Sequence, residues 1–264
     1  MQTSGKVIVA SQHYPPDSST TAAIMATIAN HLARTFDVVV LSGTAGSAVG
    51  VSRDRPQVVE VKNSMPAKAA LVRRAIAELL FTARTFLALV ARLKRGDVVL
   101  TVTAPFTLPY GVAAAARLRR AQSVLILHDL FPDVLVMSGL LKPKSVVAMA
   151  IRGINTLMFR ALNAVVIIGR DSEKLLLGYG GMTREKIRFI PNWTTLAPGI
   201  RAVQPDNPFR RTLGASFVVG LSGNLGFTHD PEIVFEAARR LQDELDIRFL
   251  LSGWGIGFER LKVR

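Results

Sequence analysis

The sequence lacks cysteine altogether. Its 264 residues therefore offer no disulfide, no thiolate metal ligand and no cysteine nucleophile, and the absence fits a reducing compartment. Aromatic residues are also few, at 7%, and they do not alternate with basic residues. Because proteins that bind single-stranded nucleic acids stack bases on aromatic side chains, the sequence argues against a nucleic-acid partner.

Acidic residues are scarce as well. There are 19 Asp and Glu against 33 Lys and Arg, which gives a net charge of +14. Residues 1–190 hold 24 of the basic and 11 of the acidic residues, so nearly all of the excess lies there. Residues 62–120 alone hold 11 basic residues against Glu78 and Asp97. An excess of this size indicates an anionic partner for the first part of the chain, which could be nucleic acid, an anionic membrane surface or many anionic ligands.

Long apolar runs are rare too. Val7–Ala10 is too short for the core of a signal peptide. The longest uncharged stretch, residues 98–116, contains Pro105, Pro109 and Gly111, which predict a strand, a turn and a helix start. We therefore expect no membrane-spanning segment in this sequence.

Short apolar runs of strand length alternate with helical segments along the chain. The strands expected are Lys6–Ala10, Val38–Ser42, Val58–Lys62, Val98–Thr103, Val124–Leu127, Val165–Ile168 and Ile187–Ile190. The helices expected between them are Thr21–Thr35, Lys68–Lys94, Tyr110–Arg120, Val146–Leu162 and Asp171–Tyr179. This alternation is typical of the α/β class, a Rossmann-like parallel sheet with helices on both faces.

A proline-rich stretch then interrupts the pattern, and the pattern restarts after it. Phe217–Ser222 and Arg248–Ser252 are expected strands, with a helix over Pro231–Leu245 between them. We therefore expect a first domain at 1–195, a linker at 196–215 and the start of a second Rossmann-like domain at 216–264. One βαβ unit buries little surface, so this second domain is expected to be incomplete.

Two loops that follow strands in the first domain are candidate site segments. In open α/β sheets, ligands bind beyond the carboxyl ends of the strands. The loop after the first strand contains Pro16, Asp17, Ser18 and Ser19, whose hydroxyls could bind phosphate or sugar oxygens. The alternative is a turn stiffened by proline in which Ser or Thr caps the next helix.

The second such loop contains His128 and Asp129, followed by Phe131-Pro132. A histidine in this position can hydrogen-bond a sugar hydroxyl or move a proton, and a neighbouring carboxylate can orient it or the substrate. An ordinary strand end followed by a turn is the alternative. His31 falls within an expected helix and is expected to be a surface or packing residue.

A glycine-containing loop follows the first strand of the second domain. Gly223, Asn224, Leu225 and Gly226 lie there, with His229 just beyond, before a helix start that could bind a diphosphate. Neither this loop nor Gly253–Gly257 matches the G-x-G-x-x-G dinucleotide motif. Walker A, HExxH and GxSxG sequences are also absent, so kinase, zinc-protease and α/β-hydrolase functions lose their main support.

The expected helix over Lys68–Lys94 is rich in arginine. Arg73, Arg84 and Arg95 are spaced by eleven residues, close to three helical turns, and therefore fall on one side. Apolar residues occupy much of the rest. Such a helix can lie in a membrane interface with its arginines toward lipid phosphates, or it can be packed on a core with a solvated basic face.

Taken together, these segments resemble the family 4 glycosyltransferases of the two-domain GT-B fold. More narrowly, they resemble the bacterial enzymes that build capsule, exopolysaccharide and lipopolysaccharide repeat units. The segments that carry the resemblance are Tyr14-Pro15-Pro16, His128–Asp133, Ile190–Trp193 and Ser222–Gly226. The resemblance implies a first domain that binds the acceptor and a second that binds a nucleotide-sugar, with retention of configuration and no cofactor or metal.

The resemblance also implies a role for each candidate. Ser18 and Ser19 belong to the acceptor-side loop, His128 contacts the sugar or acts in catalysis beside Asp129, and Gly223–Gly226 with His229 bind the donor diphosphate. The acceptor implied is a saccharide on a polyprenyl diphosphate, used in cell-envelope polysaccharide synthesis. Arg73, Arg84 and Arg95 would then face the membrane, with the protein peripheral on the cytoplasmic side of the plasma membrane.

The sequence departs from the family pattern at three points. Ser18-Ser19 stands where many relatives have two glycines, and Asn224 stands near an arginine position, which leaves His229 as the nearby basic candidate. The two glutamates, seven residues apart, that bind the donor should lie beyond Arg264. We therefore expect these residues alone to transfer sugar poorly, or to act as a binding module with only the acceptor domain. As part of a longer protein they would belong to an active enzyme.

Overall fold

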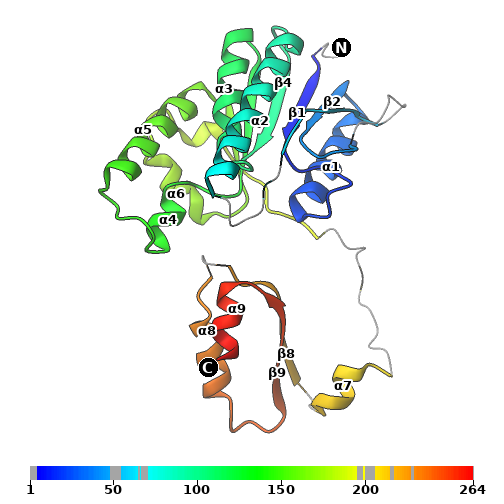
Figure 1. Ribbon diagram of the computed structural model, residues 1–264, viewed down its shortest axis with the longest axis vertical. Coiled ribbons are helices and arrows are strands. Elements are labelled where there is room, and N and C mark those ends of the chain that lie inside the picture. Colours follow the sequence, from blue (N-terminus) through cyan, green and yellow to red (C-terminus); the bar gives the residue numbers. More distant parts are fainter. Residues whose placement is uncertain are drawn as a thin grey trace. The chain divides into compact units, whose positions relative to one another are not determined.

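The computed structural model describes residues 5–47, 55–64, 66, 71–194, 199, 206–214, 217–226 and 229–263. The chain forms two compact units. The first consists of Met1–Val136 and Leu141–Leu196, and the second of Met137–Leu140 and Ala197–Arg264. Figure 1 shows the elements of each unit.

The first unit is built on a seven-stranded sheet in which all neighbouring strands are parallel. Its strands are β1 (Val7–Ser11), β2 (Val38–Ser42), β3 (Gln57–Glu60), β4 (Val98–Val102), β5 (Gln122–Leu127), β6 (Ala164–Ile167) and β7 (Ile187–Phe189). They lie in the order β3-β2-β1-β4-β5-β6-β7. From β1 the chain adds β2 and β3 on one side and β4 to β7 on the other, so the order of addition reverses between β1 and β4. Ligands of open α/β sheets bind at the carboxyl ends of the strands beside such a reversal.

Helices cover the two faces of this sheet unequally. They are α1 (Thr20–Ala33), α2 (Leu71–Arg92), α3 (Leu108–Arg119), α4 (Asp133–Met137), α5 (Val146–Ala161) and α6 (Asp171–Leu177), with a short 3₁₀ helix at Arg184–Lys186. Side chains of β1 alternate between the faces, so Val9 packs with α1 and Ile8 with α2 and α3. Helices α5 and α6 pack on the same face as α2 and α3, against β5 and β6.

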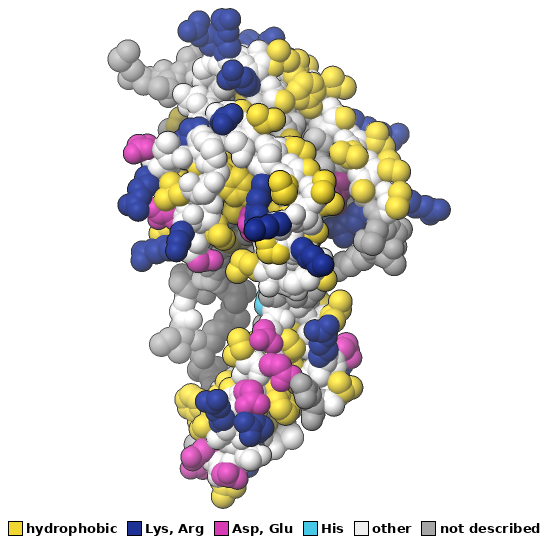
Figure 2. All heavy atoms as spheres, turned by 90° about the vertical axis from the view of Figure 1, so that its left-hand side faces the viewer, with side chains coloured by type: hydrophobic (Ala, Val, Ile, Leu, Met, Phe, Trp, Pro, Cys, Tyr) yellow, Lys and Arg dark blue, Asp and Glu magenta, His cyan; other side chains and the backbone are white. Residues whose placement is uncertain are grey.

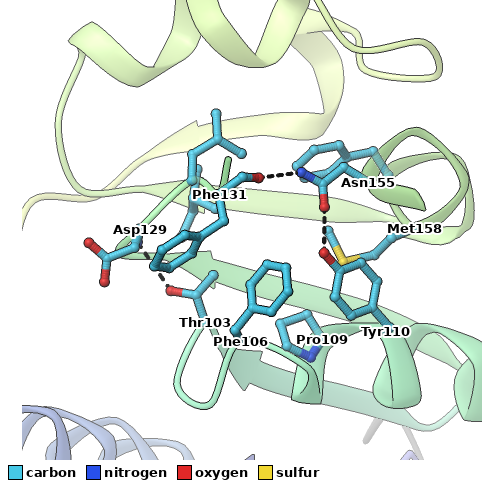
Figure 3. Close-up of a pocket in the computed structure, with 11 residues that line it drawn as sticks. Thr103, Phe106, Pro109, Tyr110, Asp129, Phe131, Asn155 and Met158 are labelled. Carbon is cyan, nitrogen blue, oxygen red and sulfur yellow. Dashed lines mark hydrogen bonds between the residues drawn. The ribbon is translucent and has the colours of Figure 1, made fainter. Parts of the chain in front are cut away.

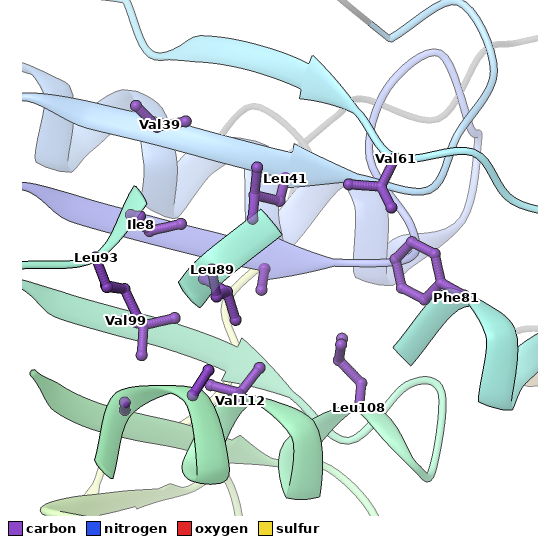
Figure 4. Packing of buried hydrophobic residues seen from close by; sticks show 13 residues of the cluster. Ile8, Val39, Leu41, Val61, Phe81, Leu89, Leu93, Val99, Leu108 and Val112 are labelled. Carbon is purple, nitrogen blue, oxygen red and sulfur yellow. The ribbon is translucent and has the colours of Figure 1, made fainter. Parts of the chain in front are cut away.

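The core beneath α2 and α3 explains why these segments are helical. Strand residues Ile8 and Val99 meet Phe81 and Leu89 of α2 and Val112 of α3, and all five are fully buried (Figure 4). The two helices present these residues at helical spacing, so one side of each is apolar. Burying a side chain of this size stabilises the fold by about 1.5–3 kcal/mol.

The second unit is small and leaves nearly all of its described apolar residues at least partly exposed. It contains α7 (Pro208–Leu213), β8 (Phe217–Asn224), α8 (Glu232–Arg240), β9 (Ile247–Trp254) and α9 (Ile256–Lys262). Strands β8 and β9 are parallel and α8 connects them. Among the described residues of this unit, Leu225 is the one buried hydrophobic side chain, whereas Ile233 and Trp254 are exposed.

These elements confirm the α/β class predicted from the sequence, with corrections at the element ends. Helix α2 ends at Arg92 because the amide of Lys94 donates to the Asp97 carboxylate (2.7 Å) and not to a helix carbonyl. Helix α8 ends at Arg240, well before the predicted Leu245, because the chain turns there to enter β9. Residues 68–70 of the predicted α2 lie outside the described residues, as do 196–198, 200–205 and 215 of the predicted linker.

Candidate functional site

The loops after β1, β4 and β5 lie at one edge of the first unit's sheet, because these neighbouring strands are parallel and end together. Two of them are the loops that the sequence analysis singled out. The third, which begins at Thr103, was predicted as a turn but not as part of a functional site. Each loop also contains a cis proline bond, before Pro16, Pro105 and Pro132 respectively.

The loop after β1 is held by its own side chains. The His13 imidazole and the Asp17 carboxylate hydrogen-bond over 2.6 Å, and the other Asp17 oxygen accepts the amide of Ser19 (2.8 Å). Ser19 in turn accepts the amide of Ala22 (3.2 Å) and caps α1. Burial raises the pKa of Asp17, but the hydrogen bonds from His13 and Ser19 outweigh it and lower that pKa overall.

The hydroxyl of Ser19 is therefore used for capping, whereas Pro16 and Ser18 are exposed at the surface of the loop. His13 was not predicted as a site residue. The signal for it is the four-residue spacing to Asp17, which suits a local pair. A histidine oriented by a carboxylate can accept a proton from a hydroxyl group, so this pair adds proton-transfer chemistry to the edge of the sheet.

The loop after β5 is fixed by a residue of β4's loop. The Thr103 hydroxyl accepts the amides of both His128 (3.1 Å) and Asp129 (3.2 Å), and Figure 3 shows the contact with Asp129. The Asp129 side chain is exposed. The His128 ring is half-buried, and its Nε2 is buried with no hydrogen-bond partner among the described residues. Burial lowers the pKa of His128 against the opposing effect of Asp129, so the ring is neutral at pH 7.

A polar network lies behind this loop. Asn155 of α5 donates to the carbonyl of Phe131 (2.5 Å) and accepts the Tyr110 hydroxyl of α3 (2.6 Å), and Figure 3 shows it between them. Asp133 accepts Arg152 of α5 (2.7 Å) and the Tyr179 hydroxyl (2.6 Å). Burial, followed by the hydrogen bond to Asp133, raises the pKa of Tyr179 to about 12.

The cavity behind the loop is too small for a sugar. It measures about 20 Å³ and is lined by Thr103, Tyr110, Phe131 and Asn155 among others (Figure 3). That volume accommodates one water molecule. A substrate of the loop would therefore bind on its outer side, where Asp129 is exposed.

The glycine loop of the second unit is packed more tightly than the sequence indicated. Gly223 has φ +143°, and a Cβ at Gly253 would lie 2.0 Å from its carbonyl oxygen. The amide of Gly257 donates to Leu225 (2.8 Å), and the amide of Gly226 donates to the His229 ring (3.2 Å). Gly253–Gly257, which fits no dinucleotide motif, thus allows β9 and α9 to approach the loop closely.

Next to this loop, Asp230 lies at the start of α8. Its carboxylate accepts the amide of Glu232 (3.0 Å), the first residue of α8, although Pro231 is the N-cap. Asp230, Glu232 and Arg260 line an open groove of about 380 Å³ at this end of α8.

The three arginines predicted to face a membrane are not equivalent. Arg73 is exposed on α2, and Arg84 donates to the carbonyl of Lys62 (2.9 Å). Arg95 lies three residues beyond the end of α2, so the eleven-residue spacing applies within the helix to Arg73 and Arg84 only. These two line an open groove of about 270 Å³ together with Ile76 and Leu80.

The residues described offer neither a metal site nor a membrane span. They contain no group of three or more His, Asp or Glu arranged to hold a metal ion. Within the same residues, no helix combines the length and the apolar character needed to cross a bilayer.

Comparison with known proteins places this geometry in a family. The sequence pattern of the glycosyl transferase 4-like domain matches residues 19–193. The probable glycosyltransferase WbjE of Pseudomonas aeruginosa is 28% identical over 179 residues, which are 67% of this chain and 44% of that protein. The chain therefore spans less than half the length of this relative.

Solved structures with a similar fold include the trehalose-6-phosphate phosphatase N-terminal domain of Candida albicans (TM-score 0.60, 10% identity, 100% of this chain and 68% of that one). UGT89C1 of Arabidopsis thaliana, complexed with UDP-L-rhamnose, has a TM-score of 0.52 at 13% identity over 97% of this chain and 71% of that one. HepE of Anabaena, in complex with UDP-glucose, has a TM-score of 0.50 at 14% identity over the same shares. These likenesses concern the fold alone.

The family pattern covers about two thirds of the chain and includes the loops after β4 and β5. The resemblance inferred from the motifs is thus confirmed. The chain belongs to the family of glycosyl transferase 4-like domains, family 4 glycosyltransferases of the GT-B type.

Proposed function

We propose that this chain is the acceptor-binding part, with the beginning of the donor-binding part, of a retaining glycosyltransferase. Its substrates would be a nucleotide-sugar and a saccharide carried on a polyprenyl diphosphate, and its pathway the synthesis of cell-envelope polysaccharide. The observation that carries the proposal is the loop His128–Asp133, held by Thr103 and Asn155 at the carboxyl edge of a sheet whose strand order reverses nearby.

The acceptor side of the proposal rests on side chains that remain accessible. Asp129 and Ser18 are exposed at the edge of the sheet, where the carboxylate accepts hydrogen bonds and the hydroxyl both donates and accepts them, whereas His128 has its Nε2 buried. Sugar hydroxyls need partners of both kinds. His13, oriented by Asp17, supplies a further base at the same edge.

The donor side rests on the glycine loop of the second unit. Gly223–Gly226 present backbone to a ligand without a side chain at either end, and the start of α8 follows. WbjE is named a probable glycosyltransferase, and HepE and UGT89C1 are described in complex with UDP-sugars. These names support a nucleoside diphosphate as the leaving group here.

In the reaction proposed, the acceptor hydroxyl oxygen bonds to the anomeric carbon while the bond from that carbon to the diphosphate breaks. The hydroxyl proton leaves with the diphosphate. The chain's own contribution is to hold the acceptor beside the donor and to stabilise the departing charge.

Two measurements test this function. Calorimetric titration with UDP-, GDP- and TDP-sugars asks whether the chain binds a donor. A transfer assay with radiolabelled nucleotide-sugar and polyprenyl-diphosphate saccharides, on the longest native protein that contains this chain, asks whether it acts.

Replacing His128 by Ala or Asp129 by Asn should lower the transfer rate by about 10²-fold or more, as for loss of an acid–base or sugar-contacting group. His31→Ala, at an exposed position of α1, is the matched control and should keep full activity. Donor titrations without heat, together with an inactive full-length protein, would leave a non-catalytic binding module as the better description.

A further inference from the structure

Helix α5 exposes an apolar side to solvent. Val146 is 83% exposed, Met149 62% and Leu157 65%, and these three lie on one side of the helix. Val147 and Ile154, at the edge of this side, are also more than half exposed. A surface helix of a soluble domain normally turns its polar side outward.

The two charged residues of α5 cover little of this apolar side. Arg152 is directed inward, where it donates to Asp133 (2.7 Å) and to the Pro143 carbonyl (3.1 Å). Arg160 is exposed in the last turn, three residues after Leu157 on the same side, so a cation ends this apolar side. The helix therefore has polar contacts on its inner side, through Arg152 and Asn155, and apolar residues on its outer side.

The neighbouring helices also expose apolar residues. The Tyr110–Asn155 hydrogen bond joins α3 to α5, and the Thr82–Thr107 hydrogen bond joins α2 to the start of α3. We name the exposed apolar residues of these three helices the outer helix surface: Val72, Ile76, Leu79, Leu80 and Leu87 of α2, Leu118 of α3, and Val146, Val147, Met149, Ile154 and Leu157 of α5. Exposed apolar residues that gather on one side, as those of α5 do, mark an interaction site.

The charge around the outer helix surface is mostly positive. Residues 71–161 contain 13 Lys and Arg but four acidic residues. Three of these four carboxylates add little negative charge to the surface, because Asp97 and Asp133 are buried and Glu78 is bonded to Arg74 (3.1 Å). In Figure 2, which views the side of the first unit where α5 lies, yellow apolar patches alternate with dark blue Lys and Arg, and fewer magenta Asp and Glu are visible.

Several of the cations stand at the ends of the helices. Lys142 and Lys144 precede α5 and are exposed, and Arg117, Arg119 and Arg120 lie at the end of α3. An apolar centre with cations at its margins matches a bilayer surface, where acyl chains lie beneath anionic headgroups. A protein partner would need an equally one-signed acidic margin around an apolar centre.

We propose that the outer helix surface docks on an anionic membrane, with the apolar side of α5 inserted at the boundary between headgroups and acyl chains. Lys142 and Lys144 contact lipid phosphates. This inference deepens the proposed function, since a lipid-linked acceptor requires the enzyme at a membrane. It also moves the main contact from the predicted arginines of α2 to a helix that the sequence analysis did not single out.

Flotation with vesicles tests the proposal on the whole chain. Vesicles of phosphatidylcholine with 30% phosphatidylglycerol, a composition chosen for the test, should carry the protein, and pure phosphatidylcholine vesicles should carry less. The triple variant Val146→Gln, Met149→Gln, Leu157→Gln should lose at least about tenfold in vesicle affinity, because it loses the inserted apolar area. The pair Lys142→Gln, Lys144→Gln should weaken binding to anionic vesicles only.

Ile233→Gln is the matched control, because Ile233 is an equally exposed apolar residue, but on α8 of the second unit. Insertion is read directly from the fluorescence of a Met149→Trp variant that also carries Trp193→Phe and Trp254→Phe. Its emission should shift to shorter wavelength with anionic vesicles, and brominated lipids should quench it. Circular dichroism checks that each variant is folded.

Unchanged vesicle binding by the triple variant, or a tryptophan at 149 that stays in water while the protein floats, would overturn the proposal. A triple variant that loses self-association but not vesicle binding would assign the surface to a second copy of the chain. Vesicle binding that depends on α5 in a protein without transferase activity would refute the proposed function and leave the membrane surface standing.

Discussion

Thr103 is an uncharged residue outside every motif, yet its hydroxyl holds the backbone of both candidate catalytic residues. Sequence inspection does not find such a residue, because its partners are about 25 positions away and become neighbours only through the pairing of β4 with β5. His128 and Asp129 themselves were found because they end an apolar run that is recognisable as a strand.

Replacing Thr103 by Val should destabilise the first unit by about 1–3 kcal/mol, because two amides lose their acceptor. Thr103→Ser keeps the hydroxyl and should lose much less. Urea unfolding followed by circular dichroism measures both. Equal losses in the two variants would show that the methyl group, and not the hydroxyl, matters at this position.

The buried ring of His128 should make stability depend on pH. Its pKa lies below that of an unfolded histidine, about 6.5, so the unfolded chain takes up this proton first as the pH falls. Stability should therefore decrease as the pH drops through 6.5 toward the lowered pKa of the folded state.

His128→Asn should flatten this dependence in urea unfolding experiments between pH 7.5 and 5.5. His31→Asn, at an exposed position, serves as the comparison and should leave the slope as it is. A wild-type slope that survives in His128→Asn would assign the pH dependence to other groups.

Helix α5 shows where the sequence pattern succeeds and where it stops. Its existence and nearly its ends were predicted from apolar spacing, and the structure has it at Val146–Ala161. Which side faces inward was not predictable, because both sides are apolar. The deciding residues are polar ones, Arg152 and Asn155, whose partners Asp133 and Phe131 lie in a loop far from them in the sequence.

The contact between α5 and this loop can be tested at Asp133. Asp133→Asn removes the charge between Arg152 and the Tyr179 hydroxyl and should cost about 1–3 kcal/mol of stability. Tyr179→Phe, which removes one neutral donor, should cost about 1 kcal/mol. Urea unfolding ranks the two variants, and the reverse order would contradict the role given to the ion pair.

Strands β8 and β9 meet at two glycines, and this pairing sets the shape of the glycine loop. Gly253→Ala should destabilise the second unit by about 1–3 kcal/mol or more, because its Cβ would lie 2.0 Å from the Gly223 carbonyl. Gly220→Ala is the matched control in β8, where an added Cβ meets nothing within 4 Å. The fluorescence of Trp254, with Trp193 replaced by Phe, reports the unfolding, and equal effects of the two substitutions would contradict this packing.

The two units differ in how stable each is expected to be on its own. All three clusters of buried apolar residues lie within residues 7–187. A shortened chain of residues 1–194 should therefore unfold cooperatively in urea at the midpoint that the first unit shows in the whole chain. Residues 206–264 alone should show no cooperative transition, since Leu225 is the one buried hydrophobic side chain described there. A clear transition in this second piece would contradict the assignment.

Charge follows the same division. The composition predicted an excess of positive charge in the first part. The structure adds that the carboxylates of Glu78, Asp97 and Asp133 are engaged in hydrogen bonds. Burial and pairing of carboxylates depend on tertiary contacts, so the sequence could reveal the excess but not the apolar surface that it surrounds.

Strand β8 pairs with β9 alone among the described residues, so the outer margin of each strand carries main-chain amides and carbonyls without strand partners. Any extended peptide can add to such a margin, including the same segment of another molecule. Concentrated samples of the whole chain should therefore scatter more light with time than samples of residues 1–194. The two-stranded sheet of the second unit would then set the concentration at which the purified protein begins to aggregate.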